Sequence, residues 1–173
     1  IQFGLDKWHE TIATKEYKSV LFFKNHGPMS GGSIRHPHSQ IIGLRNYDYH
    51  EDITVKNMNG WLLHEDQDIR ITLSKHPIIG FFEYNLRYKP DAPVRSIAMR
   101  LQQTIRYVLD SLAKFSQSYN YFFYQLEDGY EYIKVIPRYI TTPLYVGYKI
   151  PQTCNDERAA KILHNITPYF ELK

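Results

Sequence analysis

This chain contains several strand-length runs of β-branched and aromatic residues and one long amphipathic segment, and this combination limits the folds that it can adopt. Between Val94 and Phe115, apolar side chains recur every three or four positions, which predicts a helix with one buried stripe. The strand-like runs occupy residues 17–23, 61–66, 68–75, 78–88, 119–125 and 130–137. A turn at Asp128-Gly129 joins the last two runs as a hairpin. The pattern therefore predicts an α+β fold with antiparallel strands.

The two ends and the first third of the chain complete this outline. We expect a helix at each end, a glycine-rich loop, a further strand, and a polar, irregular segment that is either an excursion or a linker. The helices are expected at residues 1–15 and 156–166, and the glycine-rich loop at 24–33. The further strand is expected at residues 35–44, and the polar segment at 45–60. The order helix, strand, turn, strand occurs before residue 45 and again after residue 94, which indicates a weak internal duplication.

Composition narrows the class of protein. The 173 residues suit one domain or two small ones, and a hydrophobic fraction of 43% excludes a disordered chain. One cysteine cannot form an internal disulfide, so we expect a reducing, cytoplasmic environment. No apolar run approaches about 18 residues, so no membrane partner is expected. A net charge of +3 permits an anionic ligand, but no nucleic-acid partner is expected. Most of the 15 tyrosines lie in the second half, which predicts packing in the core or at an interface.

Residues 25–40 carry the pattern with chemical content. If residues 35–44 form a strand, His36, His38 and Gln40 project from one face of it. The preceding glycine-rich loop would bring backbone N–H groups close to an anion. A neutral imidazole backed by such donors suits nucleophilic phosphoryl or nucleotidyl transfer through a covalent histidine intermediate, with ping-pong kinetics. A pair of surface or metal-bridging histidines is the alternative interpretation of the same residues.

The complete spacing of this segment is more specific. It reads Asn25-x-Gly27-x-x-x-Gly31-x-Ser33-x-x-His36-Pro37-His38-Ser39-Gln40, where x is any residue. The segment resembles the active-site segment of galactose-1-phosphate uridylyltransferases, in the histidine-triad (HIT) superfamily, with serine in place of glycine at position 39. A second resemblance begins at Ile136-Pro137-Arg138, after a hairpin strand, and continues in the Tyr-Val-Gly-Tyr run at 145–148 and the helix from Asp156.

The resemblance implies a fold of two HIT-like half-units, built from antiparallel sheets with helices. Residues 1–59 would be the C-terminal part of the first half-unit, which is incomplete and bears the site. Residues 60–173 would be the second half-unit, complete but degenerate because it lacks the family's histidines. The resemblance also implies a homodimer that binds a nucleotide-sugar or dinucleotide and a sugar phosphate.

The resemblance further assigns roles residue by residue. His38 would be the nucleophile that accepts the nucleoside monophosphate, and Gln40 would hydrogen-bond the transferring phosphoryl group. Contacts to phosphate and nucleotide would come from Asn25, Gly27, Gly31, Gly32, Ser33 and Ser39. His36 matches a ligand of a structural zinc whose other ligands would lie upstream of Ile1. We therefore treat the chain, which starts without a methionine, as a fragment of a longer protein.

The predicted function is uridylyltransferase-like nucleotidyl transfer, and two alternatives stay open. One is a phosphorylase or hydrolase of dinucleotide polyphosphates, and the other is a non-catalytic nucleotide-binding protein. The second half departs from the family because Tyr130-Glu131-Tyr132 stand where it has H-x-H. Pro143 stands where the family has a lysine, so an acceptor contact would fall to Lys149 or Gln152.

The remaining polar groups are predicted to be solvated. The His-Glu-Asp triplets at 50–52 and 64–66 have no partners at metal-ligand spacing, and His76 begins a turn. A solvated basic face is expected beside the long helix, from Arg87, Lys89, Arg95 and Arg100.

Overall fold

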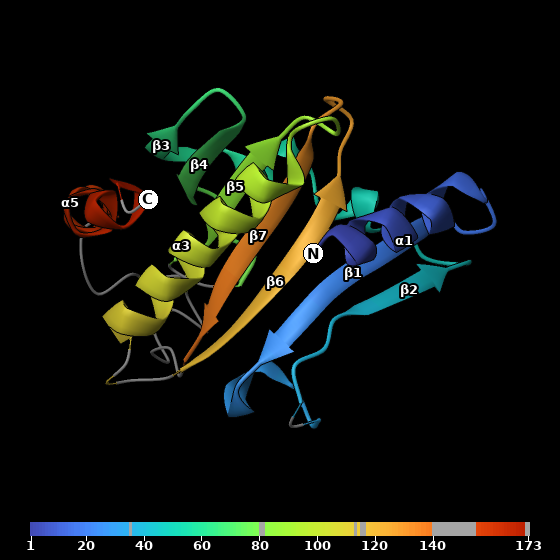
Figure 1. The fold of residues 1–173 in the computed structure, drawn as a ribbon, viewed down its shortest axis with the longest axis horizontal. Coiled ribbons are helices and arrows are strands. Elements are labelled where there is room, and N and C mark those ends of the chain that lie inside the picture. The colour runs from blue at the N-terminus through green and yellow to red at the C-terminus, as the bar shows by residue number, and fades with distance from the viewer. Residues whose placement is uncertain (35, 80–81, 113, 115–116, 140–154, 172–173) are drawn as a thin grey trace.

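Seven antiparallel strands form one sheet in the order β2-β1-β6-β7-β5-β4-β3 (Figure 1). The computed structural model describes all residues except 35, 80–81, 113, 115–116, 140–154 and 172–173. The strands are β1 (Ser19–His26), β2 (Gln40–Leu44), β3 (Gly60–Glu65), β4 (Ile69–Ser74), β5 (Tyr84–Tyr88), β6 (Ser118–Gln125) and β7 (Glu131–Arg138). The described helices are α1 (Gln2–Ala13), α2 (Val55–Met58), α3 (Val94–Leu112) and α5 (Asn155–Glu171), with 3₁₀ turns η1 (Pro28–Ser30) and η2 (Tyr49–Glu51). The expected α+β class is confirmed.

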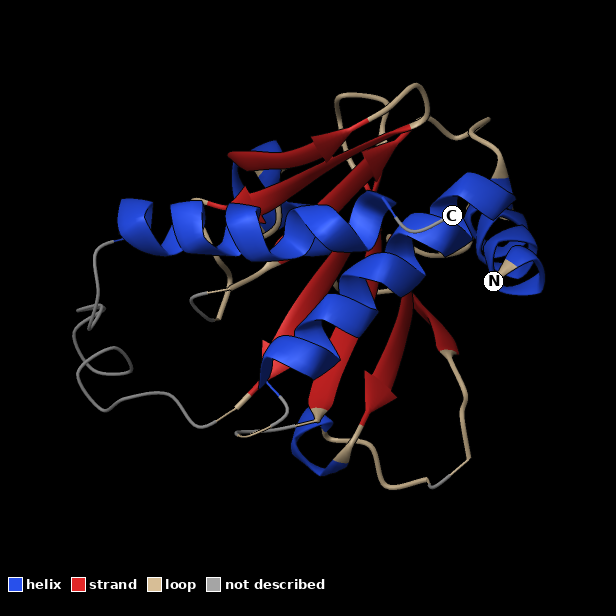
Figure 2. Cartoon of the chain, turned by 60° about the vertical axis from the view of Figure 1, so that its left-hand side comes forward, coloured by secondary structure: helices blue, strands red, loops and turns tan. Residues whose placement is uncertain are grey.

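Helices α1, α3 and α5 lie against one face of the sheet and form the main core with it (Figure 2). Trp8 of α1 is fully buried, and its Nε1 donates to the carbonyl oxygen of Val20, 2.9 Å away. The rings of Phe22 and Phe123 stack beneath it with their centroids 4.2 Å apart. Because Phe22 lies on β1 and Phe123 on β6, the centre of the core is shared by segments about a hundred residues apart in sequence.

The pairing of β1 with β6 joins two units with the same order of elements. Units α1-β1-β2 and α3-β6-β7 each consist of a helix followed by an antiparallel hairpin. The two hairpins meet along β1 and β6, which are antiparallel, with Asn25 opposite Asn120. The element order expected of a duplication is therefore present, and it forms one continuous sheet.

Of the two alternatives for residues 45–60, the structure shows the excursion, which packs on the sheet and is not a linker. Within this segment, η2 and α2 pack on the face of the sheet opposite the long helices, and Tyr49 and Met58 are buried there. They contact Tyr124, Leu126 and Tyr132, which form a second, smaller apolar cluster. The polar composition of residues 45–60 gave no sign of these two buried apolar side chains, whose burial helps to hold the segment on the sheet.

Two predicted strands are shorter than expected. Strand β2 begins at Gln40 instead of residue 35. Pro37 lies in the segment before Gln40 and has no N–H group to donate to a neighbouring strand, which disfavours strand pairing there. Strand β5 begins at Tyr84 instead of residue 78, because the N–H groups of Ile78 and Ile79 donate to the carboxylate of Glu83. The expected closing segment at 145–148, and residues 143, 149, 152 and 154, lie outside the described residues.

Candidate active site

Two glycines determine the path of the loop between β1 and β2. Gly27 and Gly31 have φ angles of 81° and 80°, in a backbone region that residues other than glycine rarely adopt. A Cβ atom at Gly27 would also lie 2.4 Å from Oγ of Ser118 and 2.8 Å from the carbonyl oxygen of Gln117. Gly31 has no atom within 4 Å of such a Cβ, so only the backbone angle requires glycine there. The loop therefore passes directly against the start of β6.

Ser30 organises this loop from within. It is 5% exposed, its Oγ donates to the carbonyl oxygen of Gly27 at 2.7 Å, and it accepts from the N–H of Gly32 at 3.3 Å. Ser33, which the sequence singled out, is exposed, and its hydroxyl has no hydrogen bond to another described residue. The sequence placed Ser30 in the loop but gave it no role of its own, although a serine hydroxyl that bonds the backbone two residues on is a common turn contact.

A polar chain from the second half of the protein holds Asn25. The Nδ2 of Asn120 donates to Oδ1 of Asn25 at 2.6 Å and to the carbonyl oxygen of Ser30 at 2.9 Å. Arg138 in turn donates to Oδ1 of Asn120 at 2.9 Å. The Oδ1 of Asn25 thus has a donor, while no described residue accepts a hydrogen bond from its N–H₂ group. Asn120 was missed because nothing in the local sequence places it opposite Asn25.

His38 has one ring nitrogen engaged with the main chain. Its Nδ1 lies 3.0 Å from the carbonyl oxygen of His36, and Nζ of Lys24 donates to the carbonyl oxygen of His38 at 3.1 Å. Since a carbonyl oxygen can only accept, this contact assigns the proton of a neutral ring to Nδ1 and the lone pair to Nε2. Partial burial lowers the pKa of Lys24. The ring is thus oriented with a nucleophilic nitrogen available.

The predicted sharing of one strand face by His36, His38 and Gln40 is wrong. Only Gln40 lies in β2, because the strand begins there, and the rings of His36 and His38 are tilted by 55° with centroids 5.5 Å apart. Gln40 is paired with Phe23, which is two residues from Asn25 on β1. Residues two apart share a strand face, so Gln40 and Asn25 lie on the same face of the sheet. The glycine loop and His38 lie at one end of this hairpin.

Ser39 is turned toward β6. Its Oγ lies 3.5 Å from the hydroxyl of Tyr121, and burial raises the pKa of that tyrosine. The predicted roles of Ser39, Gly32 and Ser33 in phosphate binding stay predictions. What the structure brings together is the loop, Asn25, His38 and the start of β2.

The described residues do not by themselves make up a zinc site. His36 is exposed, and no group of three or more His, Cys, Asp or Glu side chains among the described residues is arranged to hold a metal ion. A tetrahedral site needs four ligands, of which His36 supplies one. Zinc at His36 therefore stays a prediction that depends on ligands from elsewhere.

The corresponding place in the second unit is closed. The two hairpins can be aligned by their registers, because Ser19 at the start of β1 pairs with Leu44 and Ser118 at the start of β6 pairs with Arg138. In this alignment Lys134 is equivalent to Gln40, and Tyr132 is equivalent to His38. Lys134 and Glu83 are both 0% exposed and form an ion pair at 3.1 Å. Nζ of Lys134 also donates to the carbonyl oxygen of Asn57, next to the end of α2. Burial lowers the pKa of Lys134, and the adjacent Glu83 carboxylate opposes that shift.

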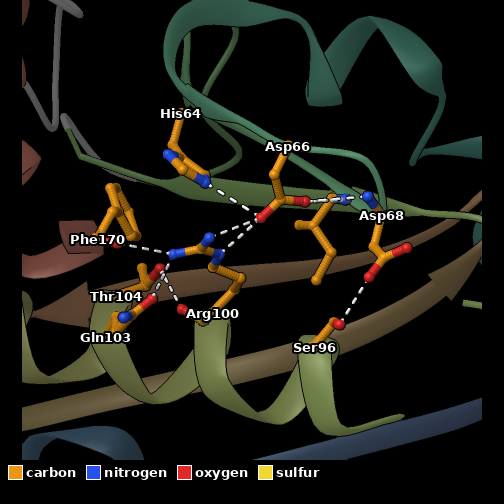
Figure 3. A network of polar contacts seen from close by, with 9 residues as sticks. His64, Asp66, Asp68, Ser96, Arg100, Gln103, Thr104 and Phe170 are labelled. Carbon is orange, nitrogen blue, oxygen red and sulfur yellow. Dashed lines mark hydrogen bonds and ion pairs between the residues drawn. The ribbon is translucent and has the colours of Figure 1, made fainter. Parts of the chain in front are cut away.

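Five of the six residues in the two His-Glu-Asp triplets are exposed, as predicted, and His64 is half-buried, but both triplets also make contacts across the fold. Asp66 accepts from Nε and Nη2 of Arg100, each at 2.8 Å, and from Nε2 of His64 at 3.2 Å (Figure 3). The side chain of Arg100 is 12% exposed, so the prediction of a solvated basic face is wrong for this residue. In the other triplet, Nε2 of His50 contacts the carbonyl oxygen of Gln125 at 2.8 Å. Both triplets join separate parts of the fold.

Comparison with known proteins gives first the class of fold and then the family. Two solved uridylyltransferase structures, one of them a mutant, have TM-scores of 0.68 with this chain at 16% and 14% sequence identity. Each match covers 96% of this chain, with 69% of the mutant structure and 66% of the other. At this identity the likeness is one of fold, and the fold is that of the uridylyltransferases.

The chain belongs to the DUF4931 family, described as a domain of unknown function. Residues 1–47 match its N-terminal domain and residues 50–170 its C-terminal domain. The crystal structure of a DUF4931 family protein from Bacillus cereus ATCC 10987 is 37% identical with a TM-score of 0.86, over 98% of this chain and 76% of that one. No significant match exists among curated proteins. No helix in the described part of the chain is long and apolar enough to span a membrane.

Proposed function

We propose that this protein is a nucleotidyltransferase in which His38 carries the transferred nucleoside monophosphate. The observation that carries this proposal is the contact between Nδ1 of His38 and the carbonyl oxygen of His36, which leaves Nε2 as a free nucleophile. The glycine loop, Asn25 and Gln40 lie at the same end of the hairpin and supply donors for phosphate oxygens. The likeness in fold to uridylyltransferases supports the same reaction class.

The proposed first half-reaction starts from the neutral His38 ring. Nε2 attacks the α-phosphorus of a nucleotide-sugar or related donor, a P–N bond forms, and the P–O bond to the leaving group breaks. The leaving group departs as a phosphate anion, so it needs no proton at neutral pH. The ring becomes cationic, and its Nδ1–H donates to the carbonyl oxygen of His36, which stabilises that charge.

The second half-reaction returns the enzyme to its starting state. An oxygen of the acceptor phosphate attacks the same phosphorus, and the P–N bond breaks to restore the neutral imidazole. Donors from Asn25, the loop backbone and Gln40 would hold the non-bridging oxygens in both steps. A phosphorylase or hydrolase of dinucleotide polyphosphates would share the first step and use phosphate or water as its acceptor.

Covalent labelling tests this proposal. The protein is incubated separately with α-³²P-labelled UDP-glucose, UTP, ATP and diadenosine tetraphosphate, and the denatured protein is examined for an adduct that is labile to acid and stable to alkali. We expect label on the wild type and on His164→Asn, a matched control because His164 is exposed on α5. We expect none on His38→Asn. No label with any donor, or equal label on His38→Asn, would contradict the mechanism.

The donor that labels the protein distinguishes the alternatives. If UDP-glucose labels the protein and added hexose 1-phosphate then removes the label, the reaction is uridylyl transfer. If only diadenosine tetraphosphate labels the protein, the phosphorylase or hydrolase is indicated. Nucleotide binding without label indicates a non-catalytic protein. The proposal includes the homodimer and the zinc at His36, which light scattering and metal analysis of the purified protein test.

A further inference from the structure

Two arginines lie opposite each other on adjacent strands of the sheet, far from the His38 loop. Arg70 of β4 and Arg87 of β5 are cross-strand partners, and both side chains are half-buried. Like charges directly opposite each other destabilise a pair of strands. Four strand spacings separate β2 from β5, roughly 19 Å, so this pair is not part of the His38 site.

The two arginines differ in their partners. Arg70 Nη1 donates to both carboxylate oxygens of Glu65, at 2.9 and 2.8 Å. The guanidinium of Arg87 lies over the ring of Tyr130, 4.4 Å from its centroid, and makes no hydrogen bond or ion pair to another residue in the described part of the chain. A guanidinium has five N–H donors in a planar fork that matches a phosphate or carboxylate group. Arg87 is therefore held in place by an aromatic ring while its donors stay available.

A cavity lies beside this pair, where the β3–β4 turn and the start of α3 meet. It has a volume of about 350 Å³, within the range of small-molecule sites. Its charged lining consists of three cations, Arg70, Arg87 and Lys89, and four carboxylates, Glu65, Asp66, Asp68 and Asp91. A smaller cavity of about 100 Å³ is lined by the same two arginines.

The acidic rim of the cavity is fixed by its own contacts. Asp66 is bound by Arg100 and by the N–H groups of Asp68 and Ile69, and Asp68 accepts from Ser96 at 2.6 Å (Figure 3). These bonds hold the turn on α3, so the cavity wall is preorganised. The carboxylates on this rim can accept hydrogen bonds from hydroxyl groups, which a purely cationic site would not offer.

We propose that this cavity binds a phosphate monoester of a small polyhydroxylated molecule, with its phosphate on Arg70 and Arg87. The phosphate would accept from the free donors of Arg87 and from those donors of Arg70 that Glu65 leaves, and hydroxyl groups would donate to the carboxylates of the rim. The site is independent of nucleotidyl transfer, because none of the residues assigned to the His38 reaction line it.

The arginine Nε–Hε resonances of ¹⁵N-labelled protein test this site directly. Spectra of Arg87→Gln, Arg70→Gln and Arg106→Gln assign the three signals, and Arg106 is the matched control because it is exposed on α3. Glucose 1-phosphate, inorganic phosphate and glucose are titrated separately. We expect the Arg70 and Arg87 signals to shift saturably with glucose 1-phosphate, more weakly with inorganic phosphate and not with glucose, while the Arg106 signal stays constant.

Variants complete the test. In Arg87→Gln the Arg70 signal should need at least about tenfold more glucose 1-phosphate for the same shift, because a charge-assisted hydrogen bond is lost. Arg87→Lys, which keeps the charge and most of the stem, should be affected less, and Arg106→Gln and His38→Asn not at all. No saturable shift of either signal in the wild type, or an unchanged titration in Arg87→Gln, would overturn the proposal. Inorganic phosphate binding as tightly as glucose 1-phosphate would overturn the assignment of the hydroxyl contacts.

Discussion

The carboxamide of Asn120 donates to the carboxamide oxygen of Asn25 across the β1–β6 pair, at 2.6 Å. Through this bond a strand of the second unit positions a residue of the proposed active site in the first. Arg138 extends the link one residue further into β7. The first unit therefore depends on the second for the geometry of its loop, although the second has no open copy of that loop.

We expect Asn120→Ala to lower the rate of His38 labelling by about 10- to 100-fold, because Asn25 and the loop lose their fixed position. The free energy of unfolding should fall by about 1–3 kcal/mol, since Arg138 is left without an acceptor. Labelling time courses and urea unfolding measure the two effects. Asn46→Ala, at an exposed position, is the control. Wild-type labelling by Asn120→Ala would show that Asn25 needs no support.

The two loop glycines should respond differently to alanine. Gly31→Ala should cost about 1–2 kcal/mol, the penalty for the left-handed backbone alone. Gly27→Ala should cost more, because its Cβ would also meet Ser118 and the backbone of Gln117. Gly31→Asn should recover part of the loss, since asparagine tolerates this backbone region. Urea unfolding of the three variants gives the comparison. Equal costs at both positions would mean that the loop moves away from β6.

Stability should fall between about pH 4 and pH 2 through Asp66. Burial would raise the pKa of Asp66, but hydrogen bonds from the N–H groups of Ile69 and Asp68 and from His64 and Arg100 outweigh it and lower this pKa to about 2. A carboxyl group whose pKa is depressed by folding stabilises the protein above its unfolded pKa and loses that contribution as pH falls through the folded pKa. Because Asp66 is exposed, solvent screening reduces the contribution of this shift to about 1 kcal/mol.

Asp66→Asn should therefore flatten the acid limb of stability plotted against pH. Guanidinium unfolding at a series of pH values measures this slope. Asp6→Asn, at an exposed position on α1, should leave it unchanged. If Asp66→Asn unfolds with the wild-type dependence on pH, another carboxylate is responsible.

Lys134→Met should cost about 3–5 kcal/mol, because it leaves the carboxylate of Glu83 buried without its cation. The double variant Lys134→Met, Glu83→Gln should be more stable than Lys134→Met, since the stranded charge is removed. Chemical denaturation of both variants, with Glu83→Gln alone, completes the cycle. His38 labelling at a permissive temperature should stay at the wild-type rate. A double variant less stable than Lys134→Met would contradict this account.

Local sequence predicted the helix along residues 94–115 and the hairpin that turns at Asp128-Gly129, because periodicity and turn chemistry act between near neighbours. It also located the glycine loop and His38 together, since they are at most about ten residues apart. The prediction of a strand from residue 35 was wrong because strand propensity does not show where a ladder partner ends. The sequence did not show that residues 45–60 pack on the sheet, because two buried side chains are too few to produce a pattern.

By itself, the sequence predicted most of the strand and helix segments and the glycines that the loop requires, and it singled out His38 as the candidate nucleophile. Only the tertiary structure decided that β1 pairs with β6, and with that pairing which residues support the loop. It also decided that Lys134 is buried against Glu83 and that Arg70 faces Arg87. Each of these contacts joins residues well separated in the chain. Strand order and register, which arise when the whole core is packed at once, bring them together, and no local pattern encodes them.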